Sequence, residues 1–107
     1  MSSDKRLAFL EQMTSSGQAD SFAWYALALE YKGRARADDA LKTFEALREK
    51  DPGYVPTYLM CGTMLTEAGR HTEARTWLEQ GVSAAKVKGD GHALSELQGA
   101  LASLSES

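Results

Sequence analysis

The sequence predicts an all-α fold of about six helices, arranged as a stack of antiparallel helix pairs. The first observation is an internal repeat with a period of 34 residues, in which side chains of similar size recur along the chain. The second is apolar spacing of three and four residues, typical of amphipathic helices, without the alternation found in strands. The third is the short connections, which make sequential helices lie antiparallel.

The repeat is seen by comparing equivalent positions, called slots here, in two successive periods. The first cycle places large and small side chains at Trp24, Leu27, Ala28, Tyr31, Ala40, Phe44, Leu47 and Pro52. One period later the same slots hold Tyr58, Cys61, Gly62, Leu65, Ala74, Leu78, Gly81 and Lys86. We therefore expect Trp24 and Tyr58 to pack in equivalent positions of successive helix pairs. Each helix pair needs the next one to cover its apolar face.

The first three helices are predicted from spacing and end signals. Residues 4–15 carry Leu7, Leu10 and Met13 on one face, and Gly17 is a plausible left-handed stop. A second helix begins near Asp20 or Ser21, which are good N-cap residues, and ends at Lys32 with Gly33 as its stop. A third covers 37–50, with acidic residues in its first turn and basic residues in its last.

The last three helices follow the break at Asp51-Pro52-Gly53. One covers 55–68, with Pro56 in its first turn and Gly69 at its end. The next begins at Thr72 and continues to Lys88, which places His71 in a turn. After Gly89-Asp90-Gly91, with Asp90 as a cap, the last helix carries a leucine stripe at Leu94, Leu97, Leu101 and Leu104.

Composition limits the class of protein. At 107 residues, with 43% hydrophobic and 25% charged residues, the chain is one domain of ordinary globular composition by the length prior. Its formal net charge of -3 argues against a nucleic-acid binder. No signal peptide, anchor or long apolar run is seen, so we expect no membrane association and a cytoplasmic location. The single Cys61 excludes an internal disulfide and fits a reducing compartment.

At these residues the chain resembles the tetratricopeptide repeat family, and in particular a small, bacterial-type protein with two repeats. The family signature W-x2-L-G-x2-Y, A-x3-F and P is matched in the first repeat except at Ala28, where the family has glycine. The second repeat keeps the pattern until Lys86 replaces the proline. The resemblance implies a right-handed superhelical stack, with repeats at 21–54 and 55–88, a half-repeat helix at 4–15 and a capping helix at 90–104 within a single domain, 1–107.

The same resemblance implies a concave groove, lined by the first helix of each repeat, that binds peptides or partner proteins. The partner-binding residues it places there are Phe22, Tyr25, Leu29, Lys32, Leu59, Thr63 and Thr66. The adjacent slots Gly33, Pro56 and Glu67 belong to the same rows, and the last helix adds His92, Ser95 and Gly99. The alternative is that terminal helices or a second copy cover this apolar patch. Carboxylate capture of the kind made by chaperone co-factors of the family is rejected, because Tyr25 and Leu29 stand where asparagine is needed.

No enzyme motif is found, and we expect no catalytic residues, no metal site and no cofactor. Cys61 holds a buried family slot, so an inert core thiol is favoured over a nucleophile, and His71 and His92 have no spacing that suggests pairing with it. The large apolar slots are interpreted as core and not as an aromatic binding box. The turn residues Lys32, Arg34 and Arg36, with Arg70 and His71, form either a solvated edge or a basic rim for an acidic peptide.

The predicted function is a protein–protein interaction module, an adaptor or scaffold that binds a peptide or helical segment of another protein in its groove. Tyr25 and Leu29 are the expected anchors, with Phe22 and Leu59 beside them and Lys32 or Arg34 steering charge. The alternative function is structural: a homodimer that self-associates through the same apolar face, because two full repeats are near the lower limit of independent stability. A small-molecule pocket with converging polar groups cannot be assembled from these residues.

Overall fold

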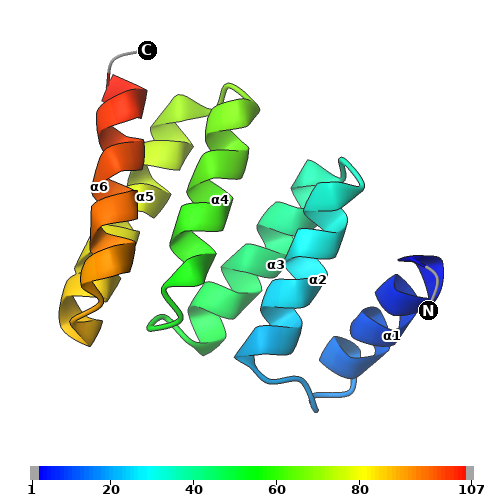
Figure 1. The fold of residues 1–107 in the computed structure, drawn as a ribbon. Coiled ribbons are helices and arrows are strands. Elements are labelled where there is room, and N and C mark those ends of the chain that lie inside the picture. The colour runs from blue at the N-terminus through cyan, green and yellow to red at the C-terminus, as the bar shows by residue number, and fades with distance from the viewer. Residues whose placement is uncertain (1–2, 106–107) are drawn as a thin grey trace. The chain divides into compact units, whose positions relative to one another are not determined.

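The computed structural model describes residues 3–105, and this part of the chain contains six α-helices and no strand (Figure 1). The predicted all-α helical-repeat fold is confirmed. The chain divides into two compact units, Met1–Asp51 and Pro52–Ser107, called unit 1 and unit 2 below. The helices are α1 (Ser3–Ser15), α2 (Ser21–Gly33), α3 (Ala37–Lys50), α4 (Pro56–Glu67), α5 (His71–Lys88) and α6 (Gly91–Ser105).

Unit 1 is a helix pair with a third helix at one side. In it, α2 pairs with α3, and α1 packs on α2 (Figure 1). The side chain of Asp20 caps α2 by accepting from the backbone N–H of Ala23 at 2.9 Å, as predicted. Ala28 has no exposed surface, which is what a small slot at a close helix crossing requires. The predicted core residues Leu27, Phe44 and Leu47 are buried.

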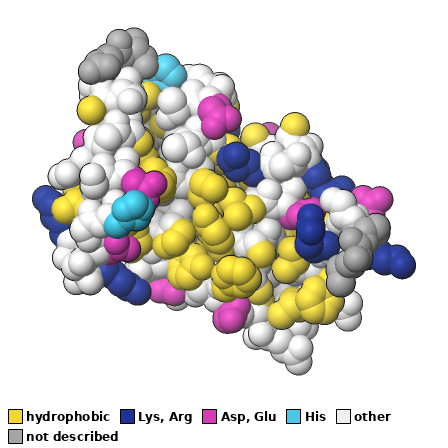
Figure 2. Space-filling view, viewed as in Figure 1, with side chains coloured by type: hydrophobic (Ala, Val, Ile, Leu, Met, Phe, Trp, Pro, Cys, Tyr) yellow, Lys and Arg dark blue, Asp and Glu magenta, His cyan; other side chains and the backbone are white. Residues whose placement is uncertain are grey.

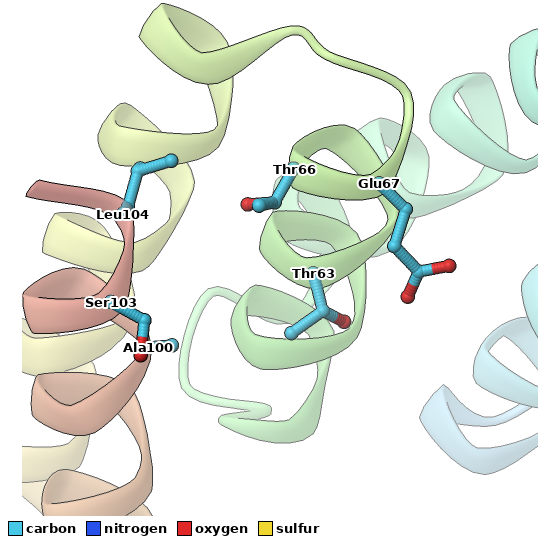
Figure 3. A pocket seen from close by; sticks show the side chains of 6 residues that line it. All are labelled: Thr63, Thr66, Glu67, Ala100, Ser103 and Leu104. Atoms are coloured by element: carbon cyan, nitrogen blue, oxygen red, sulfur yellow. The ribbon is translucent and has the colours of Figure 1, made fainter. Parts of the chain in front are cut away.

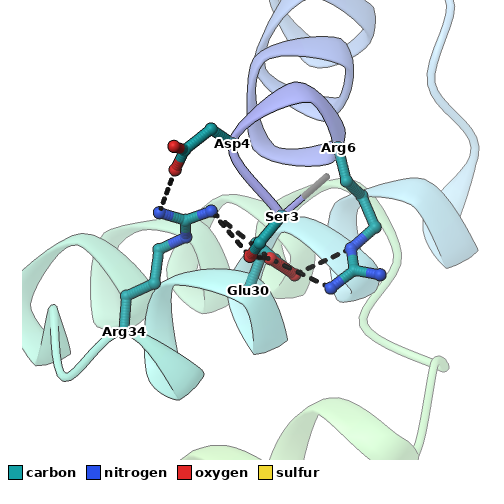
Figure 4. A network of polar contacts seen from close by, with 5 residues as sticks. All are labelled: Ser3, Asp4, Arg6, Glu30 and Arg34. Atoms are coloured by element: carbon teal, nitrogen blue, oxygen red, sulfur yellow. Dashed lines mark hydrogen bonds and ion pairs between the residues drawn. The ribbon is translucent and has the colours of Figure 1, made fainter. Parts of the chain in front are cut away.

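Two kinds of contact hold α1 on α2. Leu7 and Leu10 form a buried apolar cluster with Leu27 of α2. A network of polar contacts lies beside it and consists of Ser3, Asp4, Arg6, Glu30 and Arg34 (Figure 4). Arg6 donates to the Glu30 carboxylate from Nε at 3.1 Å and from Nη2 at 3.3 Å. Arg34 donates from Nη1 to Asp4 at 3.0 Å and lies 3.7 Å from Glu30.

The end of α2 differs from the prediction. Gly33 is helical, and the left-handed residue is Ala35, at φ +60°. The chain closes the helix there, because the N–H of Arg36 donates to the carbonyl of Tyr31 at 2.9 Å. Gly69 occupies the equivalent slot one period later, at φ +78°, and the N–H of Arg70 donates to Leu65 in the same way. Gly17 and Gly89 also have positive φ, so the predicted stop at Gly17 is confirmed.

Unit 2 is built from α4, α5 and α6, with α6 packed on both other helices (Figure 1). Two glycines permit close contact inside it. A Cβ atom at Gly62 would lie 2.5 Å from Leu78 Cδ2, and one at Gly81 would lie 2.6 Å from the Cβ of Tyr58. Leu97 of α6 approaches the same position, with its Cδ2 2.7 Å from a Cβ at Gly81, and is fully buried. The core of unit 2 is therefore set by small residues that let neighbouring large ones interlock.

Several details differ from the expectations, and one further cap agrees with them. Trp24 and Tyr31, expected in the core, are only half-buried, with Lys50 Nζ 5.1 Å from the first ring centroid and the Arg36 guanidinium carbon 4.6 Å from the second. α4 covers 56–67 instead of 55–68. His71 is the first residue of α5 and does not lie in a turn. The Asp90 carboxylate caps α6 by accepting from Ala93, as predicted.

Candidate interaction surfaces

The first candidate surface is one face of α2 in unit 1. Phe22, Tyr25, Leu29 and Lys32 follow one another at intervals of three and four residues, which aligns them along a single helix face. Phe22 is 67% exposed, and the other three are half-buried. Apolar side chains reach the surface of unit 1 in the view of Figure 2. The α2 face, defined by these four residues, therefore offers apolar surface with a lysine at its C-terminal end.

The second candidate surface lies in unit 2, where Leu59, Thr63 and Thr66 of α4 are half-buried. Thr63 and Thr66 line a hollow of about 280 Å³ together with residues of α6 (Figure 3). Leu59 is not among the residues that line it. The lining residues of this α4–α6 hollow are Thr63, Thr66, Glu67, Ala100, Ser103 and Leu104.

The threonines present little free polarity to this hollow. Thr63 Oγ1 donates to the carbonyl of Met60 at 3.1 Å, and Thr66 Oγ1 donates to that of Gly62 at 2.8 Å. Their hydroxyl protons are thus used within α4. Glu67 is exposed, and its carboxylate points away from the three α6 side chains in Figure 3. The α4–α6 hollow is mostly apolar, with one carboxylate at its rim.

The α6 residues of the hollow were not among those predicted. The expected row His92, Ser95 and Gly99 is exposed but does not line it. Ser103 lies one helical turn after Gly99. Extending the predicted row by one turn would therefore have reached a residue that lines the hollow. Ala100, three residues before Ser103, and Leu104, directly after it, belong to the same helix.

The basic turn residues are mostly paired within their own unit. Arg34 contacts Asp4 and Glu30, as described above. Arg36 Nε lies 2.8 Å from Asp39, and Arg70 donates to both carboxylate oxygens of Glu73 at 2.7 and 2.9 Å. Contacts of this kind at half-exposed positions favour the solvated edge over a basic rim.

Among the titratable side chains, Tyr31 joins two helices and Cys61 is buried. The Tyr31 hydroxyl donates to Glu11 of α1 at 2.5 Å, and burial together with this hydrogen bond raises the pKa of Tyr31 to about 12. Cys61 is fully buried, as expected. Within residues 3–105 no three His, Cys, Asp or Glu side chains are grouped so as to hold a metal ion. None of the described helices is long and apolar enough to cross a membrane.

Comparison with known proteins agrees with the helical-repeat fold. A family model described as tetratricopeptide repeat matches residues 33–104, so the chain belongs to the tetratricopeptide repeat family. Domains of this family generally mediate protein–protein interaction, and the fold is generally non-catalytic. The comparison with curated proteins gave no match.

Solved structures from bacteria are similar to the chain. A tetratricopeptide repeat domain protein from Salinibacter ruber has a crystal structure that is 38% identical, with a TM-score of 0.74, over 80% of this chain and 97% of that chain. The solution structure of such a domain from the same organism is 39% identical, with a TM-score of 0.74, over 79% of this chain and 86% of that chain. A protein from Bordetella parapertussis is 29% identical, with a TM-score of 0.79, over 94% of this chain and 87% of that chain.

Proposed function

We propose that this chain is an adaptor that binds a peptide or helical segment of another protein, with the α2 face as its main docking surface. The observation that carries the proposal is the exposure of Phe22, a large aromatic side chain, at the start of a row that continues with Tyr25 and Leu29. Contiguous apolar surface of this kind is typical of interaction sites. Aromatic anchors commonly supply most of the binding free energy.

The α4 residues Leu59, Thr63 and Thr66 belong to the same proposal as a second contact surface in unit 2. The α4–α6 hollow supports it, because an apolar recess can accept a side chain of a bound segment. Lys32 is the proposed charge-steering residue. Arg34 is the weaker choice, since it is engaged with Asp4 and Glu30. A cytoplasmic location is part of the proposal, and the single cysteine, Cys61, which is buried, is compatible with it.

The test is partner capture from a lysate of the native organism with a Tyr25→Ala, Leu29→Asp double variant. We expect capture to be lost while the helical circular dichroism is unchanged, because both side chains are only half-buried. The matched control is Val87→Asp, which changes an apolar side chain that is 90% exposed and lies outside both surfaces. Capture that survives in the double variant would refute the α2 face as the site.

A homodimer formed through the same face is the alternative. Sedimentation velocity over a wide concentration range separates the two. A dimer that the double variant dissolves would favour self-association, whereas a concentration-independent monomer would leave the adaptor function.

A further inference from the structure

The outer face of α1 carries apolar surface that is separate from the α2 face. Phe9 is 53% exposed, and Met13 is half-buried one helical turn further along. Both side chains line a hollow of about 350 Å³, whose other lining residues, Gln12, Ser16 and Gln18, are polar. We call this the α1 hollow. The adjoining face of α1, with Leu7 and Leu10, is packed on α2.

The internal repeat shows what covers the equivalent face elsewhere in the chain. Two periods after Phe9 and Met13, the same slots hold Trp77 and Gly81 of α5. Both face Tyr58 of α4: the rings of Trp77 and Tyr58 lie 6.2 Å apart, and a Cβ at Gly81 would meet the Cβ of Tyr58. The slots that form the α1 hollow are therefore those that, in unit 2, receive an aromatic side chain from an antiparallel helix.

The next contact along that helix adds a size requirement. Gly62 follows Tyr58 by one helical turn and lies so close to Leu78 that a Cβ would be 2.5 Å from Leu78 Cδ2. Leu10 of α1 holds the slot of Leu78 two periods earlier. In unit 1 the slot of Gly62 holds Ala28, which is also small and has no exposed surface. A helix that pairs with α1 in this geometry therefore needs a small residue one turn after its large one.

We propose that the α1 hollow binds an amphipathic helix of a partner protein, which places an aromatic or leucine side chain beside Phe9 and carries glycine or alanine four residues later. Such a helix would complete α1 as the second half of a repeat. The partner would bury Phe9 and Met13 in the way that α4 buries Trp77 in unit 2.

A helix of another protein is the proposed occupant, and α6 of a second copy fits the α1 hollow poorly. α6 resembles the first half of a repeat that follows two extra residues beyond the 34-residue period, and with this offset it offers Leu94 in the slot of Tyr58. Four residues later it carries Gln98, which is exposed, where Gly62 and Ala28 are small. The bulk of that glutamine would meet Leu10 in the way a Cβ at Gly62 would meet Leu78. Head-to-tail stacking of two copies is thereby disfavoured.

The experiment is an NMR titration of the full-length chain with a capped synthetic peptide of residues 54–69, which carries Tyr58 and Gly62. We expect amide shifts at Phe9, Met13 and the neighbouring α1 residues. A peptide with Gly62→Gln should bind about tenfold more weakly, because the larger side chain prevents the close crossing. The variant Phe9→Asp should weaken binding by a similar factor, and Val87→Asp should leave it unchanged.

Four results would overturn the proposal. The first is the absence of α1 shifts at the highest soluble peptide concentration, and the second is equal binding of the glycine and glutamine peptides. The third is a set of shifts confined to unit 2, which would mean that the peptide exchanges with α4. The fourth is a concentration-dependent dimer that Phe9→Asp dissolves, which would assign the hollow to a second copy. Circular dichroism of Phe9→Asp verifies that α1 stays folded, as expected for a residue that is 53% exposed.

Discussion

The two units hold their terminal helices by different means. In unit 1, α1 packs on α2 through Leu7, Leu10 and Leu27, which are 4–9% exposed, and through charged contacts around Glu30. In unit 2, α6 is held through Leu97 and Leu104, which are 0% and 4% exposed. Leu97 Cδ2 would be only 2.7 Å from a Cβ at Gly81, so the helices interlock there.

The difference has consequences for how each attachment responds to conditions. Apolar burial is proportional to the area removed from water and changes little with pH or salt. Ion pairs at partly exposed positions depend on the protonation of the carboxylates and are screened by salt. We therefore expect the α6 attachment to be sensitive to side-chain size and the α1 attachment to be sensitive to charge as well.

The largest expected effect comes from filling the close contact in unit 2. Gly81→Ala should lower the free energy of unfolding by about 2 kcal/mol, because the new methyl group would overlap Tyr58 Cβ and Leu97. Chemical denaturation measures the change. Gly99→Ala on the exposed face of α6 is the matched control, since a Cβ there meets nothing within 4 Å. That variant should be stabilised by about 1 kcal/mol through helix propensity.

A second prediction uses the equivalent turns of the two units. Ala35 and Gly69 are one period apart, and both adopt a positive φ, +60° and +78°. Ala35→Gly should stabilise the protein by about 1 kcal/mol, because glycine removes the clash of Cβ in the left-handed region. Gly69→Ala should destabilise it by a similar amount, although space is open around the residue. Thermal unfolding of the two variants and of the exchange double variant tests the pair. Equal signs for both substitutions would refute the interpretation.

Most of the fold could be predicted because the repeat slots are encoded locally. The small slots Ala28, Gly62 and Ala74 and the large slots Phe44 and Leu78 recur with the period, and their burial follows from helical spacing. Trp77 was missed, because the slot that it occupies in α5 holds Thr43 one period earlier, and a comparison by size class does not link a threonine with a tryptophan. Both are buried.

The candidate surfaces were only partly predictable. A helix face follows from intervals of three and four residues, so the row from Phe22 to Lys32 could be named from the sequence. The α4–α6 hollow depends on where α6 lies, and this is decided by tertiary packing at Gly81 and Leu97. The exposure of Phe9 depends on whether another helix packs on that face of α1. Residue spacing within α1 does not encode this.

The smallest expected effect concerns the charged attachment of α1. Hydrogen bonding from Arg6 is the main cause that lowers the pKa of Glu30 below its ordinary 4.5, and contacts with Ser3 and Arg34 add to it. A lowered folded-state pKa means that the stabilisation is present above the unfolded-state value of 4.5 and is lost as the pH falls through the folded-state value. Glu30→Gln should therefore lower the melting temperature near neutral pH and become indistinguishable from the native chain in strong acid.

Glu73→Gln in unit 2 gives the matched comparison. Arg70 also lowers the pKa of Glu73, by the hydrogen bond first, but the pair lies within one turn of α5 and both side chains are more than a third exposed. Glu30 is only 13% exposed and joins two helices, so its substitution should have the larger effect, and salt should reduce that effect by a smaller fraction than it does for Glu73→Gln. Melting curves of the two variants at several pH values and two salt concentrations measure this. If the Glu30→Gln difference persisted unchanged in strong acid, or if Glu73→Gln had the larger effect, the charge of Glu30 would not be what stabilises the α1 attachment.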